Sequence, residues 1–100
     1  MRRAARIDSN HSAVVSALRK CGCAVQSLAA VGAGVPDLLC CTQRGHTFLA
    51  EVKDGSLPPS ARALTPDQRE WHARWPGRVY VIERAEDVPS VVVNACRSAA

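Results

Sequence analysis

Two apolar runs that flank a three-residue turn constrain the fold more than any other part of this sequence. Residues 38–42 are strongly apolar, residues 47–53 contain a second apolar run that ends in charged residues, and Gln43-Arg44-Gly45 lies between the two segments. Gly45 accepts the positive φ angle that a short hairpin turn often requires. The sequence therefore predicts an antiparallel β-hairpin whose open end lies where both apolar runs meet charged residues.

Those charged residues belong to two short motifs. Residues 35–39 (Val-Pro-Asp-Leu-Leu) lead into the first strand, and residues 51–53 (Glu-Val-Lys) end the second. Because side chains along a strand alternate between its faces, Glu51 and Lys53 point the same way. We expect Asp37, Glu51 and Lys53 to meet at one end of the sheet, with Pro36 as the first residue of its strand, where its missing N–H is tolerated.

Two carboxylates and one ammonium group suit a magnesium-dependent phosphodiesterase. Mg²⁺ prefers oxygen ligands, usually one or two carboxylates with water and substrate phosphate, and the backbone carbonyl of Val52 offers a further oxygen. Such an ion, for which we expect Mn²⁺ to substitute, lowers the pKa of a bound water, and Lys53 would stabilise charge on the transition state. Each motif alone also fits an exposed strand face or a simple turn, but their order and spacing favour a metal site at Asp37 and Glu51.

Segments on either side of the hairpin predict a small α/β domain. Apolar periodicity predicts a helix over residues 10–20, with Asp8, Ser9 or Asn10 as its N-cap and Gly22 as its stop. Residues 24–28 and 79–82 have the composition of strands.

Two further helices are expected in the second half of the chain. Thr65-Pro66-Asp67-Gln68 has the composition of a helix start, and that helix should run to about Trp75. The C-terminal segment, residues 85–100, should form a helix, although Val91-Val92-Val93 fits a strand equally well. The expected order is α-β-β-β-α-β-α, with a four-stranded mixed sheet flanked by helices in one domain over residues 1–100.

The chain carries a net charge of +4, and eleven of its thirteen cationic residues are arginines. Such a surface suits a polyanionic partner, although it fits simple solubility equally well. We expect contacts with nucleic acid from two regions, the N-terminal arm of residues 1–7 and the loop of residues 54–64, through Arg2, Arg3, Arg6, Ser60 and Arg62.

The cysteines argue against zinc and against a disulfide framework. The count of five is odd, and no Cys-x-x-Cys pair is present. Free thiols fit a reducing cytoplasm, which is where we expect the protein. No segment approaches the length of a membrane span, so we expect no membrane partner.

Residues 34–39 (Gly-Val-Pro-Asp-Leu-Leu) and 51–53 together resemble the signature of the PD-(D/E)XK nuclease superfamily. Within it, the chain is similar to small phage and bacterial nucleases of the VRR-NUC type, which are related to Holliday-junction resolvases. Asp54-Gly55 and residues 64–72 also match, so that the resemblance extends over roughly residues 5–84.

This resemblance implies a restriction-endonuclease-like α-β-β-β-α-β core and a phage or bacterial origin. It implies that Asp37 and Glu51 are metal ligands, that Lys53 is the catalytic lysine and that Gln68 is an auxiliary active-site residue. The family often adds an acid from the first helix. The nearby candidates here are Asp8, Asn10 and His11.

His72 follows Gln68 at i+4, so both side chains share a helix face. His72 would either reach the site, as a phosphate contact or proton carrier, or serve only as a surface or packing residue.

The leading interpretation is a Mg²⁺-dependent DNA endonuclease, as a homodimer that cuts two strands. The family suggests selectivity for branched or junction DNA. A non-catalytic DNA-binding module that retains the nuclease fold is the main alternative, and an interaction protein that binds no nucleic acid is another.

Overall fold

The structure, a computed structural model, describes residues 8–97. Arg2, Arg3 and Arg6 therefore lie outside the described residues. The elements follow the predicted order, and the final segment is helical. They are α1 (His11–Lys20), β1 (Ala24–Ser27), β2 (Leu38–Cys41), β3 (Thr47–Val52), α2 (Pro66–Arg74), β4 (Val79–Ile82) and α3 (Val88–Arg97), with 3₁₀ turns at Pro59–Ala61 and Ala85–Asp87.

The four strands form one mixed sheet, as predicted, and lie in the order β1-β2-β3-β4. The pairs β1–β2 and β2–β3 are antiparallel, whereas β4 joins β3 in parallel after the crossover through α2. Gly45 closes the β2–β3 turn with a φ angle of 87°. Leu38 faces Ala50 in the register, so the next positions toward the open end belong to Asp37 and Glu51.

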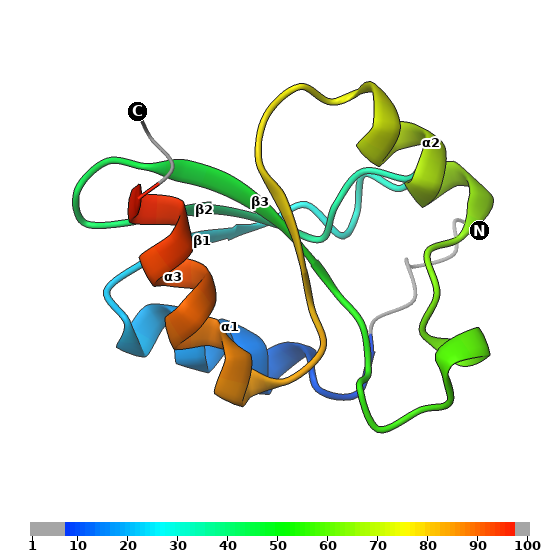
Figure 1. Cartoon of the computed structure of the whole chain (residues 1–100), viewed down its shortest axis with the longest axis horizontal. Helices are drawn as coiled ribbons and strands as arrows, with labels where there is room; N and C mark the ends of the chain where they lie inside the picture. Colours follow the sequence, from blue (N-terminus) through cyan, green and yellow to red (C-terminus); the bar gives the residue numbers. More distant parts are fainter. Residues whose placement is uncertain (1–7, 98–100) are drawn as a thin grey trace.

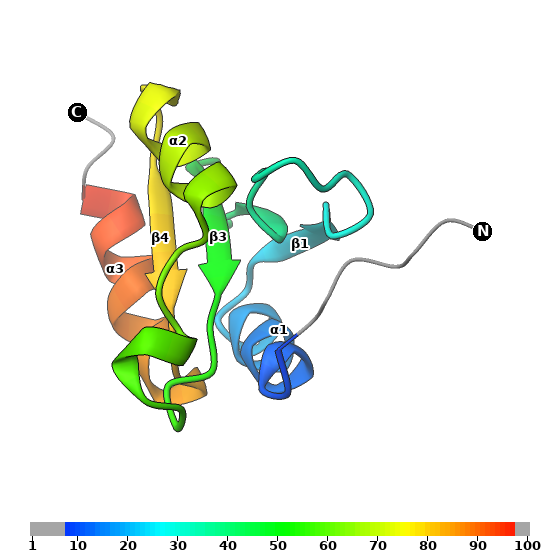
Figure 2. The same ribbon diagram turned by 90° about the vertical axis from the view of Figure 1, so that its right-hand side faces the viewer.

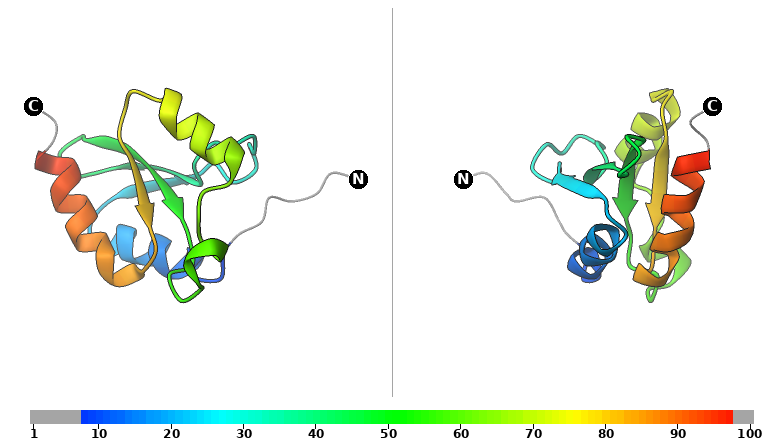
Figure 3. Two further views of the ribbon diagram at one scale, coloured as in Figure 1. Left: turned by 45° about the vertical axis from the view of Figure 1, so that its right-hand side comes forward. Right: turned by 90° about the vertical axis from the view of Figure 1, so that its left-hand side faces the viewer.

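The helices lie on opposite sides of this sheet (Figures 1 and 3). Helices α1 and α3 cover one face, and α2 stands over the other. Figure 2 shows the loop that follows β3 passing in front of the sheet on its way up to α2. The two faces are therefore covered differently. Two amphipathic helices cover the first face, whereas a single helix and a loop cover the second.

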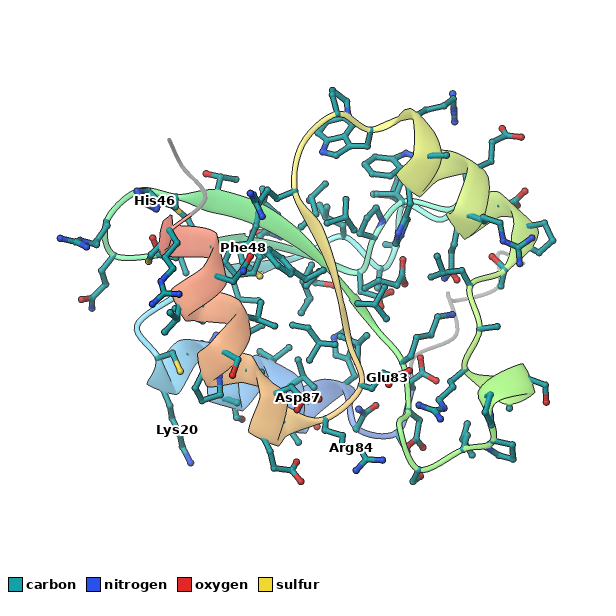
Figure 4. The ribbon with its side chains drawn as sticks, viewed as in Figure 1. Lys20, His46, Phe48, Glu83, Arg84 and Asp87 are labelled. Carbon is teal, nitrogen blue, oxygen red and sulfur yellow. The ribbon has the colours of Figure 1, made fainter. Side chains whose placement is uncertain are left out.

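The hydrophobic core fills the layer between the sheet and the helices α1 and α3. Alternate residues of the central strands point into it and meet one face of each helix. Phe48, labelled in Figure 4, is 1% exposed and meets Tyr80 edge-on at 5.5 Å between ring centroids. The buried residues of this cluster are Val14, Leu18, Cys23, Leu38, Cys40, Phe48, Ala50, Val52, Ile82, Val88 and Ala95.

Several local expectations need correction. Strand β2 begins at Leu38, so the expectation that Pro36 is its first residue is wrong. Pro36 is instead buried just before the strand, where its lack of an N–H interrupts further ladder bonding. Asn10, one of the three N-cap candidates, occupies the N-cap position of α1 but makes no side-chain capping bond. Its Nδ2 donates across the fold to the carbonyls of Lys53 and Glu83, and its buried Oδ1 has no hydrogen-bond partner among the described residues.

All five cysteines lie within residues 8–97 and are free thiols. Cys40 is a buried core residue, as its place in an apolar strand predicts. No helix among the described residues is long and apolar enough to cross a membrane.

Candidate functional site

A cleft of about 580 Å³ opens at the end of the sheet on the side of α2. It brings together the residues of both acidic motifs with one residue of α2. Its lining consists of Asp8, Asp37, Glu51, Lys53, Leu57, Ser60, Ala61, Ala63, Leu64, Thr65 and Gln68. The loop between β3 and α2 supplies one wall, and the strand ends supply the charged floor.

Asp37 is held in place by the hairpin itself. Its Oδ2 accepts a hydrogen bond from the backbone N–H of Val52 at 2.8 Å, across the open end of the β2–β3 pair. The Val52 side chain is 2% exposed and points into the core, as strand alternation predicts. The same alternation turns Glu51 and Lys53 into the cleft.

Glu51 is a buried acid, with 1% of its surface exposed. Its Oε2 accepts from Gln68 Nε2 at 3.2 Å, and its Oε1 lies 3.2 Å from His72 Nε2. Burial raises the pKa of Glu51 to about 8, and the charge of Asp37 and a hydrogen bond with it act in the same direction. Lys53 opposes this shift. A cation bound beside the two carboxyl groups would favour the charged form of Glu51.

Gln68 links the lysine to the acid. Its Oε1 accepts from Lys53 Nζ at 2.7 Å, while its Nε2 donates to Glu51. Gln68 is also the third residue of a capping box, in which it exchanges hydrogen bonds with Thr65 at the start of α2. The Thr-Pro-Asp-Gln start therefore both begins the helix and aims an amide into the site.

His72 contacts Glu51 but is not among the residues that line the cleft, so that its role as a phosphate contact or proton carrier stays a prediction. Its side chain is 14% exposed and lies one turn beyond Gln68, against Glu51. Burial lowers the pKa of His72, and the positive charge of Lys53 lowers it further. A neutral imidazole can donate to the Glu51 carboxylate and hold its orientation.

The three candidates near the first helix have different positions. Asp8 lines the cleft, and its charge contributes to the raised pKa of Glu51. Asn10 donates to the carbonyl oxygens of Lys53 and Glu83, at 3.0 and 2.9 Å, and so connects α1 to the ends of β3 and β4. His11 is not among the residues that line the cleft. The acidic candidate is thus Asp8, which precedes the helix.

The two candidates in the loop differ in whether they line the cleft. Ser60 lines the cleft, within the 3₁₀ turn Pro59–Ala61. Arg62 does not line it, because its guanidinium pairs with Glu83 at 2.9 Å. Figure 4 shows Glu83 and Arg84 where β4 leaves the sheet, beside the segment that follows β3. Arg62 therefore connects the loop to β4 in this structure.

Within the described part of the chain, no group of three or more His, Cys, Asp or Glu side chains stands arranged to hold a metal ion. The donors in the cleft are the carboxylates of Asp37 and Glu51, with Asp8 nearby. Two hard oxygen donors fit the way proteins bind Mg²⁺, which keeps several waters and takes oxygens from substrate phosphate.

Sequence inspection missed the part that Thr65 and the apolar side chains of Leu57 and Leu64 play in shaping the cleft. The capping box is the signal that indicates Thr65. The leucines carry no comparable signal, because an apolar residue in a loop has no periodicity to place it.

No protein-family model matches the sequence, and no curated protein matches it. A solved structure described as a "VRR_NUC domain" does match, with 26% identity and a TM-score of 0.62, over 82% of this chain and 88% of that one. The present chain is therefore similar to a VRR_NUC nuclease domain in sequence and in its restriction-endonuclease-like fold, which confirms the resemblance predicted from its two acidic motifs.

Proposed function

We propose that this chain is a metal-dependent nuclease that hydrolyses phosphodiester bonds in DNA, with Mg²⁺ as the metal and Mn²⁺ as a substitute. The observation that carries the proposal is that Asp37 and the buried Glu51 share one cleft with Lys53, while Gln68 connects Lys53 to Glu51 by hydrogen bonds. A buried acid with a strongly raised pKa in a cleft is typical of functional sites.

The donor set supports a hard divalent cation. Asp37 and Glu51 would hold it, with the Val52 backbone carbonyl and the Asp8 carboxylate, which lines the cleft, as further oxygen donors. When bound, the ion would polarise the scissile phosphate and lower the pKa of a water molecule.

The other polar residues of the cleft have roles that follow from their contacts. Lys53 presents an ammonium group that can stabilise charge developing on phosphate oxygens. Gln68 positions that group, since it accepts its hydrogen bond at 2.7 Å. His72 and Gln68 together orient the two oxygens of Glu51.

Substrate contacts are proposed for Ser60 at the cleft wall and for Arg2, Arg3 and Arg6 along the phosphate backbone. Selectivity for branched or junction DNA and a homodimer that cuts both strands remain proposals. Sedimentation of the protein with and without a four-way junction would measure its oligomeric state directly.

The test is cleavage of linear, nicked and branched DNA in the presence of Mg²⁺, Mn²⁺ or EDTA. Wild-type protein should cut only with metal. Asp37→Asn, Glu51→Gln and Lys53→Ala should each lower the rate by about 100-fold or more, as the loss of a group that stabilises the transition state does. Glu70→Gln is the matched control, because Glu70 is an exposed acid on α2 outside the cleft.

Full activity of Glu51→Gln would rule out this site. Metal-independent DNA binding by wild-type protein without any cleavage would instead favour the non-catalytic DNA-binding module. A gel shift at two salt concentrations separates that result from an interaction protein with no affinity for DNA.

A further inference from the structure

The indole side chains of Trp71 and Trp75 take no part in the site described above. They stack on each other, with ring centroids 4.8 Å apart and planes inclined by 20°. Trp75 is 46% exposed, and α2 has no buried residue. An aromatic pair that only packed α2 onto the sheet would be covered, so this exposure calls for another partner.

Trp75 lies at the end of α2, next to Gly77. Its N–H donates to the carbonyl of Trp71 at 3.1 Å as the helix ends. A side chain at residue 77 would bring a Cβ within 2.7 Å of the indole Nε1, so Gly77 leaves the space in which this ring edge lies. Trp71 stacks on the Trp75 ring and Gly77 lies at its edge, and 46% of the Trp75 surface remains exposed.

The pair is continuous with the cleft through α2. Trp71 meets the ring of His72 edge-on, at 6.4 Å between centroids, and His72 lies 3.2 Å from Glu51. Trp71 and Trp75 each follow a site residue, Gln68 or His72, by three positions, so all four side chains share one side of the helix. A ligand strand that leaves the cleft along α2 would therefore meet the exposed indole.

A positive charge, that of Arg74, directly precedes Trp75 in the sequence. The Arg74 side chain is 70% exposed and contacts Glu70 only at 4.0 Å. Arg78, beyond Gly77, is not available in the same way, because its Nη1 donates to Tyr80 Oη at 3.0 Å and to Asn94 Oδ1 on α3 at 3.3 Å. An exposed cation beside an exposed aromatic side chain suits single-stranded nucleic acid, in which bases are unpaired and can stack on the ring.

We propose that Trp71 and Trp75 form a stacking site for an unpaired nucleobase of a nucleic acid strand bound in the cleft. The inference rests on the proposed function in taking the substrate to be nucleic acid, but it requires no cleavage. Bases inside a blunt duplex are already stacked and do not reach the site.

Tryptophan fluorescence tests this directly, because the chain contains two tryptophans and both belong to the pair. The full chain is titrated in EDTA with a single-stranded oligonucleotide, a forked duplex with unpaired arms, and a blunt duplex of the same sequence. The first two should quench the fluorescence, and the blunt duplex should not.

Trp75→Ala should weaken binding of the single strand by about 10-fold or more, the usual effect of losing one base–aromatic stack. Trp75→Phe should retain much of the affinity and checks that folding is intact. Val93→Ala, at a side chain on α3 that is 52% exposed, is the control and should bind like wild-type protein.

Equal quenching by the blunt duplex, no quenching by any oligonucleotide, or wild-type affinity of Trp75→Ala would each overturn the stacking site. Cleavage with Mg²⁺ is measured on the same substrates. Selective quenching without cleavage would overturn the proposed nuclease activity and leave the stacking site standing. Cleavage without quenching would overturn the stacking site and leave the nuclease activity standing.

Discussion

The two faces of the sheet are built by different kinds of interaction. On one face, α1 and α3 bury a continuous apolar layer. On the other, α2 buries no residue and is connected to the strands by Gln68 and His72, through hydrogen bonds to Lys53 and Glu51. Apolar burial stabilises the fold whatever the pH, whereas a polar network around a buried acid depends on protonation and on bound ions. The molecule thus separates the layer that stabilises it from the layer that carries its proposed chemistry.

The apolar face should show the greatest change in stability. Phe48→Ala removes a fully buried ring between the sheet and α3, and should lower the free energy of unfolding by about 3–5 kcal/mol. Urea denaturation followed by circular dichroism measures it. A loss below about 1 kcal/mol would mean that the core does not provide the main stabilisation.

The polar face should respond to pH through Glu51. Its pKa of about 8 in the folded state lies above the ordinary value of 4.5, so the folded state binds the proton more tightly. In the absence of metal, the contribution of Glu51 to the free energy of unfolding is fully present below about pH 4.5. As the pH rises from there to about 8, this contribution falls by at most about 1.4 kcal/mol per pH unit.

Thermal melts of wild-type protein and Glu51→Gln across that pH range check this expectation. The variant should lose most of the slope and should be the more stable protein at pH 9. Added Mg²⁺ should raise the melting temperature of wild-type protein more at pH 9 than at pH 6, since the acid must lose its proton to bind the ion. An identical pH slope in both proteins would contradict the assignment.

Gln68→Ala tests the connection between α2 and the strands. It removes half of the capping box and both contacts of the amide with the site, and should cost about 1 kcal/mol of stability. The rate of cleavage should fall although Glu51 and Lys53 are intact. Gln68→Glu, which preserves the cap but adds a charge beside Glu51, should recover the stability and not the rate.

Arg62→Ala should have the least effect. The half-buried pair with Glu83 is worth about 0.2–1 kcal/mol, as partly exposed ion pairs usually are. Because Arg62 is engaged by Glu83, the salt dependence of DNA binding should not change. A decrease of about one in the slope of log affinity against log salt would show instead that Arg62 contacts a phosphate.

Local patterns accounted for most of the fold. The hairpin, the element order and the start of α2 follow from strand alternation, a glycine at the turn and a capping box, all of which act between residues close in sequence. The C-terminal helix was ambiguous because Val91-Val92-Val93 suits both elements, and packing of α3 on the core decides it. The start of β2 was misplaced because Pro36 is buried before the strand.

For the site, the sequence by itself determined that Asp37, Glu51 and Lys53 would meet, because the hairpin register and the two-residue period leave them no other place. Only the tertiary structure decided that Asp8 enters the cleft while Asn10 connects strand ends, and that Arg62 pairs with Glu83. These contacts join residues that are distant in sequence, and they depend on how α1 and the loop pack against the strand ends. No local sequence pattern encodes that packing, because contacts throughout the core determine how one element lies against another.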